Sequence, residues 1–218
     1  MTCTFDIKMI PQLIIGISGG SGSGKTFFAN QLTQHFSKNQ IAQVSLDNYY
    51  LPLDAQVKDE QGVENFDLPE AIDHQRLYSD LIKLISGKSI ELKEYQFNQK
   101  EVVAKTLTIQ PCPVILVEGL FTFYYPQLSK LLDLKIFLEA PEDVMLKRRI
   151  ARDSHHRGYA LNEVIYQFEK HALPAYKKYI LPLKNQANLL ISNQHGFDKS
   201  LPLICDEIEQ HLKIVSRQ

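Results

Sequence analysis

The chain has 218 residues, 44% of them hydrophobic, and can bury the core of one compact domain, so we expect a single domain over residues 1–218. Lysine and arginine (24) nearly balance aspartate and glutamate (25), which argues against a nucleic-acid-binding protein held by its net charge. Three widely separated cysteines fit neither a disulfide framework nor a clustered metal site and favour a reducing cytoplasm. No apolar run approaches the roughly 20 residues of a membrane span, so we expect no membrane partner and a cytoplasmic location.

Short apolar runs alternate with helical patterns along the chain. The runs suit strands of a parallel sheet covered on both faces, and they lie at residues 12–17, 41–46, 114–117, 134–138 and 188–191. The helical patterns lie at residues 25–37, 69–86, 141–153, 161–180 and 200–215. This alternation predicts an α/β fold with a parallel sheet and helices on both of its faces. Together with the glycine-rich motif at residues 19–26, it indicates a fold of the P-loop NTPase type.

Two segments interrupt the alternation. Residues 88–109 contain two strand-like runs separated by polar residues, which predicts a small β-hairpin beside the main sheet. Residues 51–66 are polar and irregular, so we expect a surface loop near whatever the strand ends bind.

A phosphate-binding motif follows the first predicted strand. Residues 19–26 read GGSGSGKT, which fits G-x-x-x-x-G-K-[ST] between a strand and a helix. The glycines allow backbone N–H groups to turn toward an anion, and the helix N-terminus adds positive potential. We expect Lys25 to reach the β and γ phosphates of ATP and the Thr26 hydroxyl to bind Mg²⁺. The predicted nucleotide-binding residues are Gly19, Gly20, Ser21, Gly22, Ser23, Gly24, Lys25 and Thr26.

The rest of the chain favours a small kinase over a switch or a motor. A guanine-nucleotide switch would carry an N-K-x-D motif, which is absent from this sequence. Residues 59–62 spell D-x-x-G, but they lie in a polar stretch and we interpret the match as chance. A kinase needs a base for the acceptor hydroxyl and cations for the transferred phosphate.

Two acids are placed for this chemistry. Asp47 directly follows the second predicted strand, at the same edge of the sheet as the glycine-rich turn, and can take a proton from an acceptor hydroxyl. An aspartate that starts a turn is the alternative. Glu118 ends the run at 114–117 and can hold Mg²⁺ through water, with a solvated strand-end carboxylate as the alternative.

A basic segment follows farther along the chain. Arg149 and Arg152 share a helix face, and Arg157 lies in the polar segment after them. These arginines can close over ATP as a lid at about residues 152–160, although a charged run can also be a solvated helix face. His155 and His156 lack a third spaced ligand, so we interpret them as surface histidines.

Several ordered blocks resemble the uridine kinase family, whose relatives include phosphoribulokinase, pantothenate kinase and nicotinamide riboside kinase. They are GISGGSGSGKT (16–26), DNYY (47–50), NFDLPEAID (65–73), VILVEGLFTFY (114–124) and RRIARDSHHRG (148–158). The resemblance runs from about Ile14 to Ser192. It implies transfer of the ATP γ phosphate, with Mg²⁺, to the 5′-hydroxyl of a nucleoside such as uridine. Members often form tetramers, so a homo-oligomer is a further expectation, although no sequence feature marks an interface.

The resemblance also implies roles for individual residues. It makes Asp47 the base and Asp67 the acid that grips the ribose hydroxyls, and two neighbouring hydroxyls suit one carboxylate. Lys25, Arg152 and Arg157 are the implied charge-stabilising residues. The remaining residues that match the substrate site are Tyr50, Phe66, Tyr95, Phe97, Arg149 and Gln167.

Two positions depart from the family's usual pattern. Lys100 stands where a histidine usually reads the base, and Tyr159 follows the lid's R-G where an arginine is usual. Since lysine only donates hydrogen bonds, Lys100 would prefer the carbonyl of uracil over an amino group if it reaches the base; it can also point to solvent. The same chemistry on phosphoribulose, pantothenate or a pyridine riboside is therefore an alternative. A nucleotide-binding regulator with little kinase activity is another.

Overall fold

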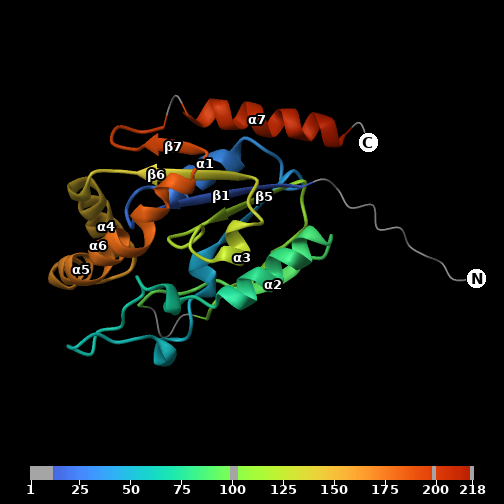
Figure 1. The fold of residues 1–218 in the computed structure, drawn as a ribbon. Helices are drawn as coiled ribbons and strands as arrows, with labels where there is room; N and C mark the ends of the chain where they lie inside the picture. The colour runs from blue at the N-terminus through green and yellow to red at the C-terminus, as the bar shows by residue number, and fades with distance from the viewer. Residues whose placement is uncertain (1–11, 99–102, 198–199, 217–218) are drawn as a thin grey trace, which may run out of the picture.

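A parallel sheet forms the centre of the computed structural model, which describes residues 12–98, 103–197 and 200–216 (Figure 1). Its five strands pair in the order β2-β5-β1-β6-β7, and every pairing is parallel. They are β1 (Leu13–Gly19), β2 (Ile41–Ser45), β5 (Val114–Glu118), β6 (Leu134–Glu139) and β7 (Leu189–Ser192). The predicted strands and the predicted fold class are confirmed.

Helices cover both faces of this sheet, because alternate strand residues point to opposite sides. Ile15 and Ile17 of β1 belong to one core cluster with residues of α1 (Lys25–Gln34) and α7 (Ser200–Val215). Ile14 belongs to the other cluster, with residues of α2 (His74–Ile85). Figure 1 shows α1 and α7 on one side of the sheet, with α2 and α3 (Pro126–Ser129) on the other.

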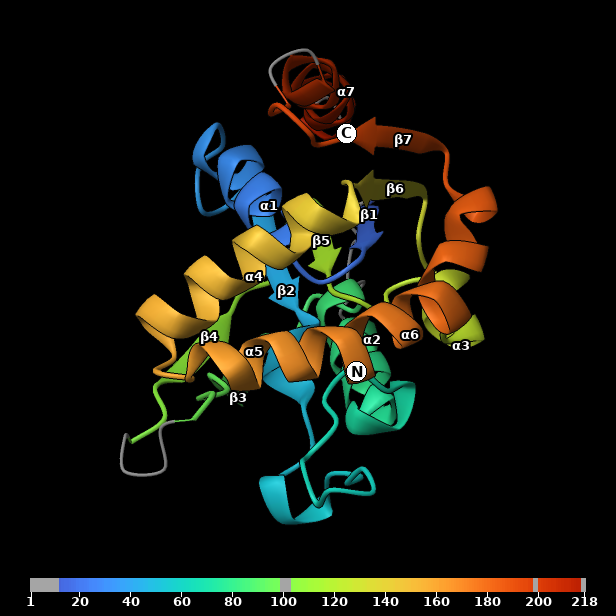
Figure 2. The same cartoon turned by 90° about the vertical axis from the view of Figure 1, so that its left-hand side faces the viewer.

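Two helical segments lie across the carboxyl ends of the strands (Figure 2). They are α4 (Glu142–His156) and a longer segment that contains α5 (Leu161–Gln167) and α6 (Leu173–Ala175). The predicted helix over 161–180 is helical throughout, but residues 168–172 and 176–180 form wider π turns. Pro174 lies between the two π turns and has no N–H to donate to the ordinary helical ladder.

Two predicted helices are shorter than expected. The helix predicted over 25–37 ends at Gln34. The helix predicted from residue 69 begins at His74, because Pro69–Ala71 forms a separate 3-10 turn. The Asp73 side chain then accepts a hydrogen bond of 3.0 Å from the Arg76 backbone N–H and caps the helix.

The predicted hairpin is confirmed as a separate two-stranded antiparallel sheet of β3 (Ile90–Lys93) and β4 (Thr106–Ile109). Lys100 lies outside the described residues. The segment over 51–66 is irregular as predicted, apart from a 3-10 turn at Leu53–Ala55 and an isolated antiparallel bridge between Lys58 and Glu64. Within the described part of the chain, no helix has the length and apolar character needed to cross a membrane.

Candidate active site

The glycine-rich turn joins the carboxyl end of β1 to the first residue of α1, as predicted. Gly22 has a φ of 81°, and a Cβ there would lie 2.3 Å from the Met145 carbonyl oxygen, so only glycine fits. Lys25 Nζ donates to the Gly20 carbonyl oxygen at 3.0 Å inside the turn. Burial lowers the pKa of Lys25 to about 8, although the nearby charges of Glu118 and Asp47 act in the opposite direction. The Lys25 ammonium group therefore lies inside the glycine-rich turn.

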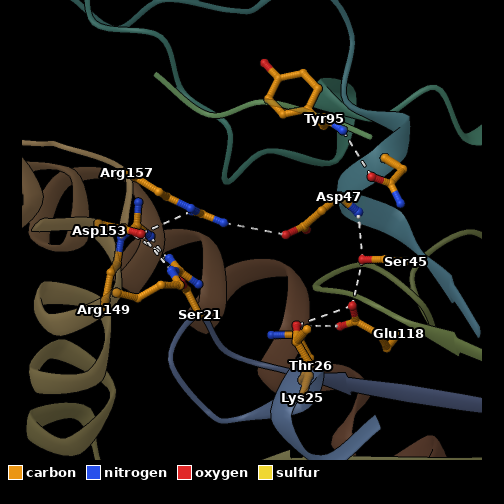
Figure 3. A network of polar contacts seen from close by, with 12 residues as sticks. Ser21, Lys25, Thr26, Ser45, Asp47, Tyr95, Glu118, Arg149, Asp153 and Arg157 are labelled. Atoms are coloured by element: carbon orange, nitrogen blue, oxygen red, sulfur yellow. Dashed lines mark hydrogen bonds and ion pairs between the residues drawn. The ribbon is translucent and has the colours of Figure 1, made fainter. Parts of the chain in front are cut away.

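Oxygen ligands suitable for Mg²⁺ meet beside this turn. Thr26 Oγ1 lies 3.2 Å from Glu118 Oε2, and Ser45 Oγ donates to Glu118 Oε1 at 2.6 Å (Figure 3). Burial and then the charge of Asp47 raise the pKa of Glu118. A buried carboxylate beside the more accessible Thr26 hydroxyl fits a hard cation that also takes phosphate oxygens. Within the described residues, no group of three or more acidic, histidine or cysteine side chains is arranged to hold a metal ion, so phosphate would have to complete such a site.

Asp47 follows β2 and faces the same cavity as the glycine-rich turn. Its backbone N–H donates to Ser45 Oγ at 3.4 Å, which links it to Glu118 through a single hydroxyl. Asp47, Lys25 and Thr26 all line one cavity with a volume of about 60 Å³. Ligand pockets usually measure about 300–1,000 Å³, so the surrounding side chains must move apart before a nucleotide and an acceptor fit together.

A buried ion pair stands on the other side of this cavity. Arg149 Nη1 lies 3.1 Å from Asp67 Oδ2, and both side chains are less than a tenth exposed (8% and 7%). The same nitrogen donates to Ser21 Oγ of the glycine-rich turn at 3.2 Å, and Nη2 donates to Gln167 Oε1 at 3.4 Å. The structure thus brings Asp67, Arg149 and Gln167 together and connects them to the glycine-rich turn through Ser21.

Asp153 is a site residue that the sequence reasoning left without a role. It is 2% exposed, and its carboxylate lies 2.7 Å from Arg152 Nε. Arg157 Nη1 lies 3.1 Å and Arg149 Nε 3.3 Å from the same carboxylate (Figure 3). Burial opposes its ionisation, but hydrogen bonds from Arg152 and the charges of all three arginines lower the pKa of Asp153. Asp153 lies four residues from both Arg149 and Arg157 in the sequence, and this helical spacing could have predicted the two ion pairs.

Arg157 lies between the two halves of the cavity. Its guanidinium stands 3.6 Å from the centre of the Phe97 ring, and Nη2 is 3.9 Å from Asp47 Oδ2. Its backbone carbonyl accepts a hydrogen bond of 3.0 Å from Asn98 Nδ2. The lid segment therefore contacts the hairpin directly. His155 and His156, at the end of α4, are exposed as expected.

Four aromatic rings from three segments form the remaining wall. The Tyr50 ring centre lies 5.3 Å from that of Tyr95, 5.4 Å from Phe66 and 5.6 Å from Phe97. Tyr50, Phe66 and Phe97 line the cavity, and so does Tyr159, while Tyr95 contacts the other three rings. The Tyr95 backbone N–H donates to Asn48 Oδ1 at 3.1 Å, which holds the hairpin against the residue after Asp47. Flat apolar faces of this kind suit a planar ring.

Comparisons with known proteins agree with this geometry. A model of the "Phosphoribulokinase / Uridine kinase family" matches residues 14–198. Uridine-cytidine kinase B of Dictyostelium discoideum is 36% identical over 199 residues, covering 91% of this chain and 80% of that protein. The uridine kinase of Borrelia duttonii (strain Ly) is 36% identical over 204 residues, covering 94% of this chain and 98% of that protein.

Solved structures share the fold at lower sequence identity. A possible uridine kinase from Bacillus stearothermophilus superposes with a TM-score of 0.61 at 20% identity, covering 85% of this chain and 91% of that chain. A putative fructose transport system kinase from Silicibacter sp. TM1040 gives 0.60 at 22% identity, covering 85% and 92%. The family model spans the glycine-rich turn, the hairpin and the arginine-bearing helix. The chain belongs to the phosphoribulokinase / uridine kinase family.

Proposed function

We propose that the chain transfers the γ phosphate of ATP to the 5′-hydroxyl of a nucleoside, with uridine as the expected acceptor. One observation carries the proposal: Asp47 and the glycine-rich turn line the same cavity as Asp67 and the aromatic wall. A phosphate donor site, a proton acceptor and a site for a sugar with a flat base therefore adjoin one another. The named relatives, which are uridine and uridine-cytidine kinases, support this choice of acceptor.

The residues divide the reaction between them. Asp67 accepts hydrogen bonds from the ribose hydroxyls, and the aromatic wall packs against the base. Asp47 takes the proton of the 5′-hydroxyl while the oxygen of that hydroxyl forms a bond to the γ phosphorus. The bond between the γ phosphorus and the β–γ bridging oxygen breaks, which releases ADP. Lys25, Arg152 and Arg157 stabilise the charge on the transferring phosphate.

Mg²⁺ bound with the triphosphate would neutralise part of its charge. Thr26 and Glu118 are the residues that would hold it, since their oxygens meet at the edge of the glycine-rich turn. The backbone of that turn and Lys25 orient the phosphates whether or not the carboxylate of Glu118 binds the ion through water. A cytoplasmic location, one domain over residues 1–218 and a homo-oligomer stay predictions.

An acceptor panel tests the proposal. Purified protein with ATP and Mg²⁺ is offered uridine, cytidine, nicotinic acid riboside and pantothenate, and the products are identified by mass spectrometry. We expect uridine 5′-monophosphate to form with the highest kcat/KM. Faster phosphorylation of pantothenate or of the pyridine riboside would replace the nucleoside assignment with one of the alternatives.

The comparison of cytidine with uridine tests the hypothesis that Lys100 donates to a carbonyl group of the base. Equal kcat/KM for cytidine and uridine would refute the preference for a carbonyl acceptor, because an ammonium group can only donate to the base. Tight ATP binding without transfer to any acceptor of the panel would favour the nucleotide-binding regulator.

A further inference from the structure

A narrow projection carries two of the acceptor-site residues at its base. Residues 57–65, called the finger here, fold back on themselves: Asp59 N–H donates to the Val63 carbonyl at 2.9 Å and Asn65 N–H to the Val57 carbonyl at 2.7 Å. Figure 1 draws it in teal, outside the parallel sheet. Phe66 and Asp67 follow it directly in the chain. No finger residue is buried, so apolar packing contributes little to holding the finger in place.

Asp59 attaches the finger to the helical segment that follows the lid. Its Oδ2 accepts a hydrogen bond from the Tyr166 hydroxyl at 2.7 Å and lies 2.8 Å from His171 Nε2. Its Oδ1 accepts from the backbone N–H groups of Gln61 and Val63, both at 2.9 Å. The hydrogen bond from Tyr166 is the largest influence that lowers the pKa of Asp59. One carboxylate therefore organises the finger internally and joins it to a helix more than 100 residues away.

A second connection closes a ring of contacts. Asp67 N–H donates to Asn65 Oδ1 at 3.0 Å at the base of the finger. The Asp67 carboxylate pairs with Arg149, which donates in turn to Gln167, the residue next to Tyr166. The finger is thus held to the same helical segment at its tip by Asp59 and at its base through Asp67. Loss of the tip contact leaves the base attached to that segment indirectly, through Asp67, Arg149 and Gln167.

We propose that Asp59 is a positioning residue for the acceptor: by holding the finger to Tyr166 and His171, it fixes the direction in which Asp67 presents its carboxylate to two neighbouring hydroxyls of the substrate. The D-x-x-G residues at 59–62 therefore have a structural role, the folding and attachment of the finger, that is unrelated to guanine nucleotides. The inference rests on the proposed function, because it concerns the sugar that Asp67 binds. It assigns acceptor affinity and ribose selectivity to a residue outside the cavity lining.

The test uses Asp59→Asn, which preserves side-chain size and removes the charge. We expect the KM for uridine to rise about tenfold, as for the loss of one hydrogen bond to a charged group, with the KM for ATP and kcat changed less than about threefold. The preference for uridine over 2′-deoxyuridine should fall by a similar factor. Tyr166→Phe should raise the KM for uridine in the same direction. Glu60→Gln is the matched control, because it removes an exposed charge from the neighbouring finger residue and should leave every constant unchanged.

A double-variant cycle identifies the route. If Asp59 acts through Asp67, adding Asp59→Asn to Asp67→Asn should raise the KM for uridine less than about twofold further. A full additional tenfold rise would overturn the inference. So would an unchanged uridine KM in folded Asp59→Asn and Tyr166→Phe proteins, or an equal loss of affinity for ATP and uridine. Transfer to uridine by the unsubstituted protein is the reference: its absence would refute the proposed function itself, and the inference with it.

Discussion

Asp153→Asn tests whether one buried carboxylate organises the arginines of the site. Asp153 makes three ion pairs between 2.7 and 3.3 Å, and removing its charge leaves three neighbouring cations without their shared partner. Breaking a buried pair costs about 3–5 kcal/mol, and we expect the lower end because Arg152 and Arg157 can regain water. For a chain of this size, a loss of about 3 kcal/mol lowers the melting temperature by about 6–12 °C. The loss is measured by calorimetry and by urea unfolding.

Activity should fall together with stability in Asp153→Asn, because the arginines that we propose to neutralise phosphate lose their fixed positions. We expect kcat to fall at least about 100-fold, as for the loss of preorganised charge stabilisation. Asp143→Asn is the matched control on the same helix: Asp143 pairs with Lys147 at 3.1 Å, but its side chain is 65% exposed, so its loss should leave the melting temperature nearly unchanged.

The pH dependence of this contact has a definite sign. The pKa of Asp153 is depressed in the folded protein, so its stabilising contribution is complete above the ordinary aspartate value of about 3.9 and is lost as the pH falls through the folded value. The stability difference between wild type and Asp153→Asn should be constant from about pH 5 to 8 and shrink below about pH 4. Equal melting temperatures of Asp153→Asn and Asp143→Asn at pH 7 would refute the reasoning.

Three further predictions concern individual residues of the site. The pKa of Lys25 is lowered to about 8, so the side chain should lose its charge as the pH rises, and kcat/KM for ATP should fall above pH 8. A plot of kcat/KM against pH that stays flat to about pH 9.5 would contradict this. Glu118→Gln removes the acid that we propose for Mg²⁺ binding and should raise the Mg²⁺ concentration for half-maximal activity about tenfold. An unchanged Mg²⁺ requirement in a magnesium titration would be the contrary result. Phe97→Leu removes one ring of the aromatic wall that we propose to pack against the base, and it should raise the KM for uridine about five- to tenfold in steady-state assays. An unchanged KM would exclude Phe97 from binding the base.

Local patterns in the sequence were sufficient to predict the sheet and the phosphate-binding turn. The central strands β1 and β5 are nearly continuous apolar runs, because helices cover both of their faces, and the glycine-rich turn has a motif tied to its geometry. Position at the carboxyl ends of parallel strands also placed Asp47 and Glu118 at one edge of the sheet.

Contacts between distant segments escaped prediction. Asp59 meets Tyr166 across 107 positions of sequence, and no periodic pattern encodes that meeting. The π turns on either side of Pro174 do not interrupt the apolar pattern of the helix, so the sequence pattern could not reveal them. Asp153 was hidden within a charged run that resembles a solvated helix face, and only its burial distinguishes it from Asp143.

The catalytic role of Asp47 is the central claim, and single-turnover transfer from γ-labelled ATP to uridine tests it most directly. Wild-type protein and Asp47→Asn are mixed with the two substrates, and labelled uridine monophosphate is measured over time by rapid quenching. The account predicts that Asp47→Asn binds ATP with a dissociation constant within about twofold of wild type but transfers phosphate about 10²–10⁴-fold more slowly. Transfer by Asp47→Asn at close to the wild-type rate would contradict it.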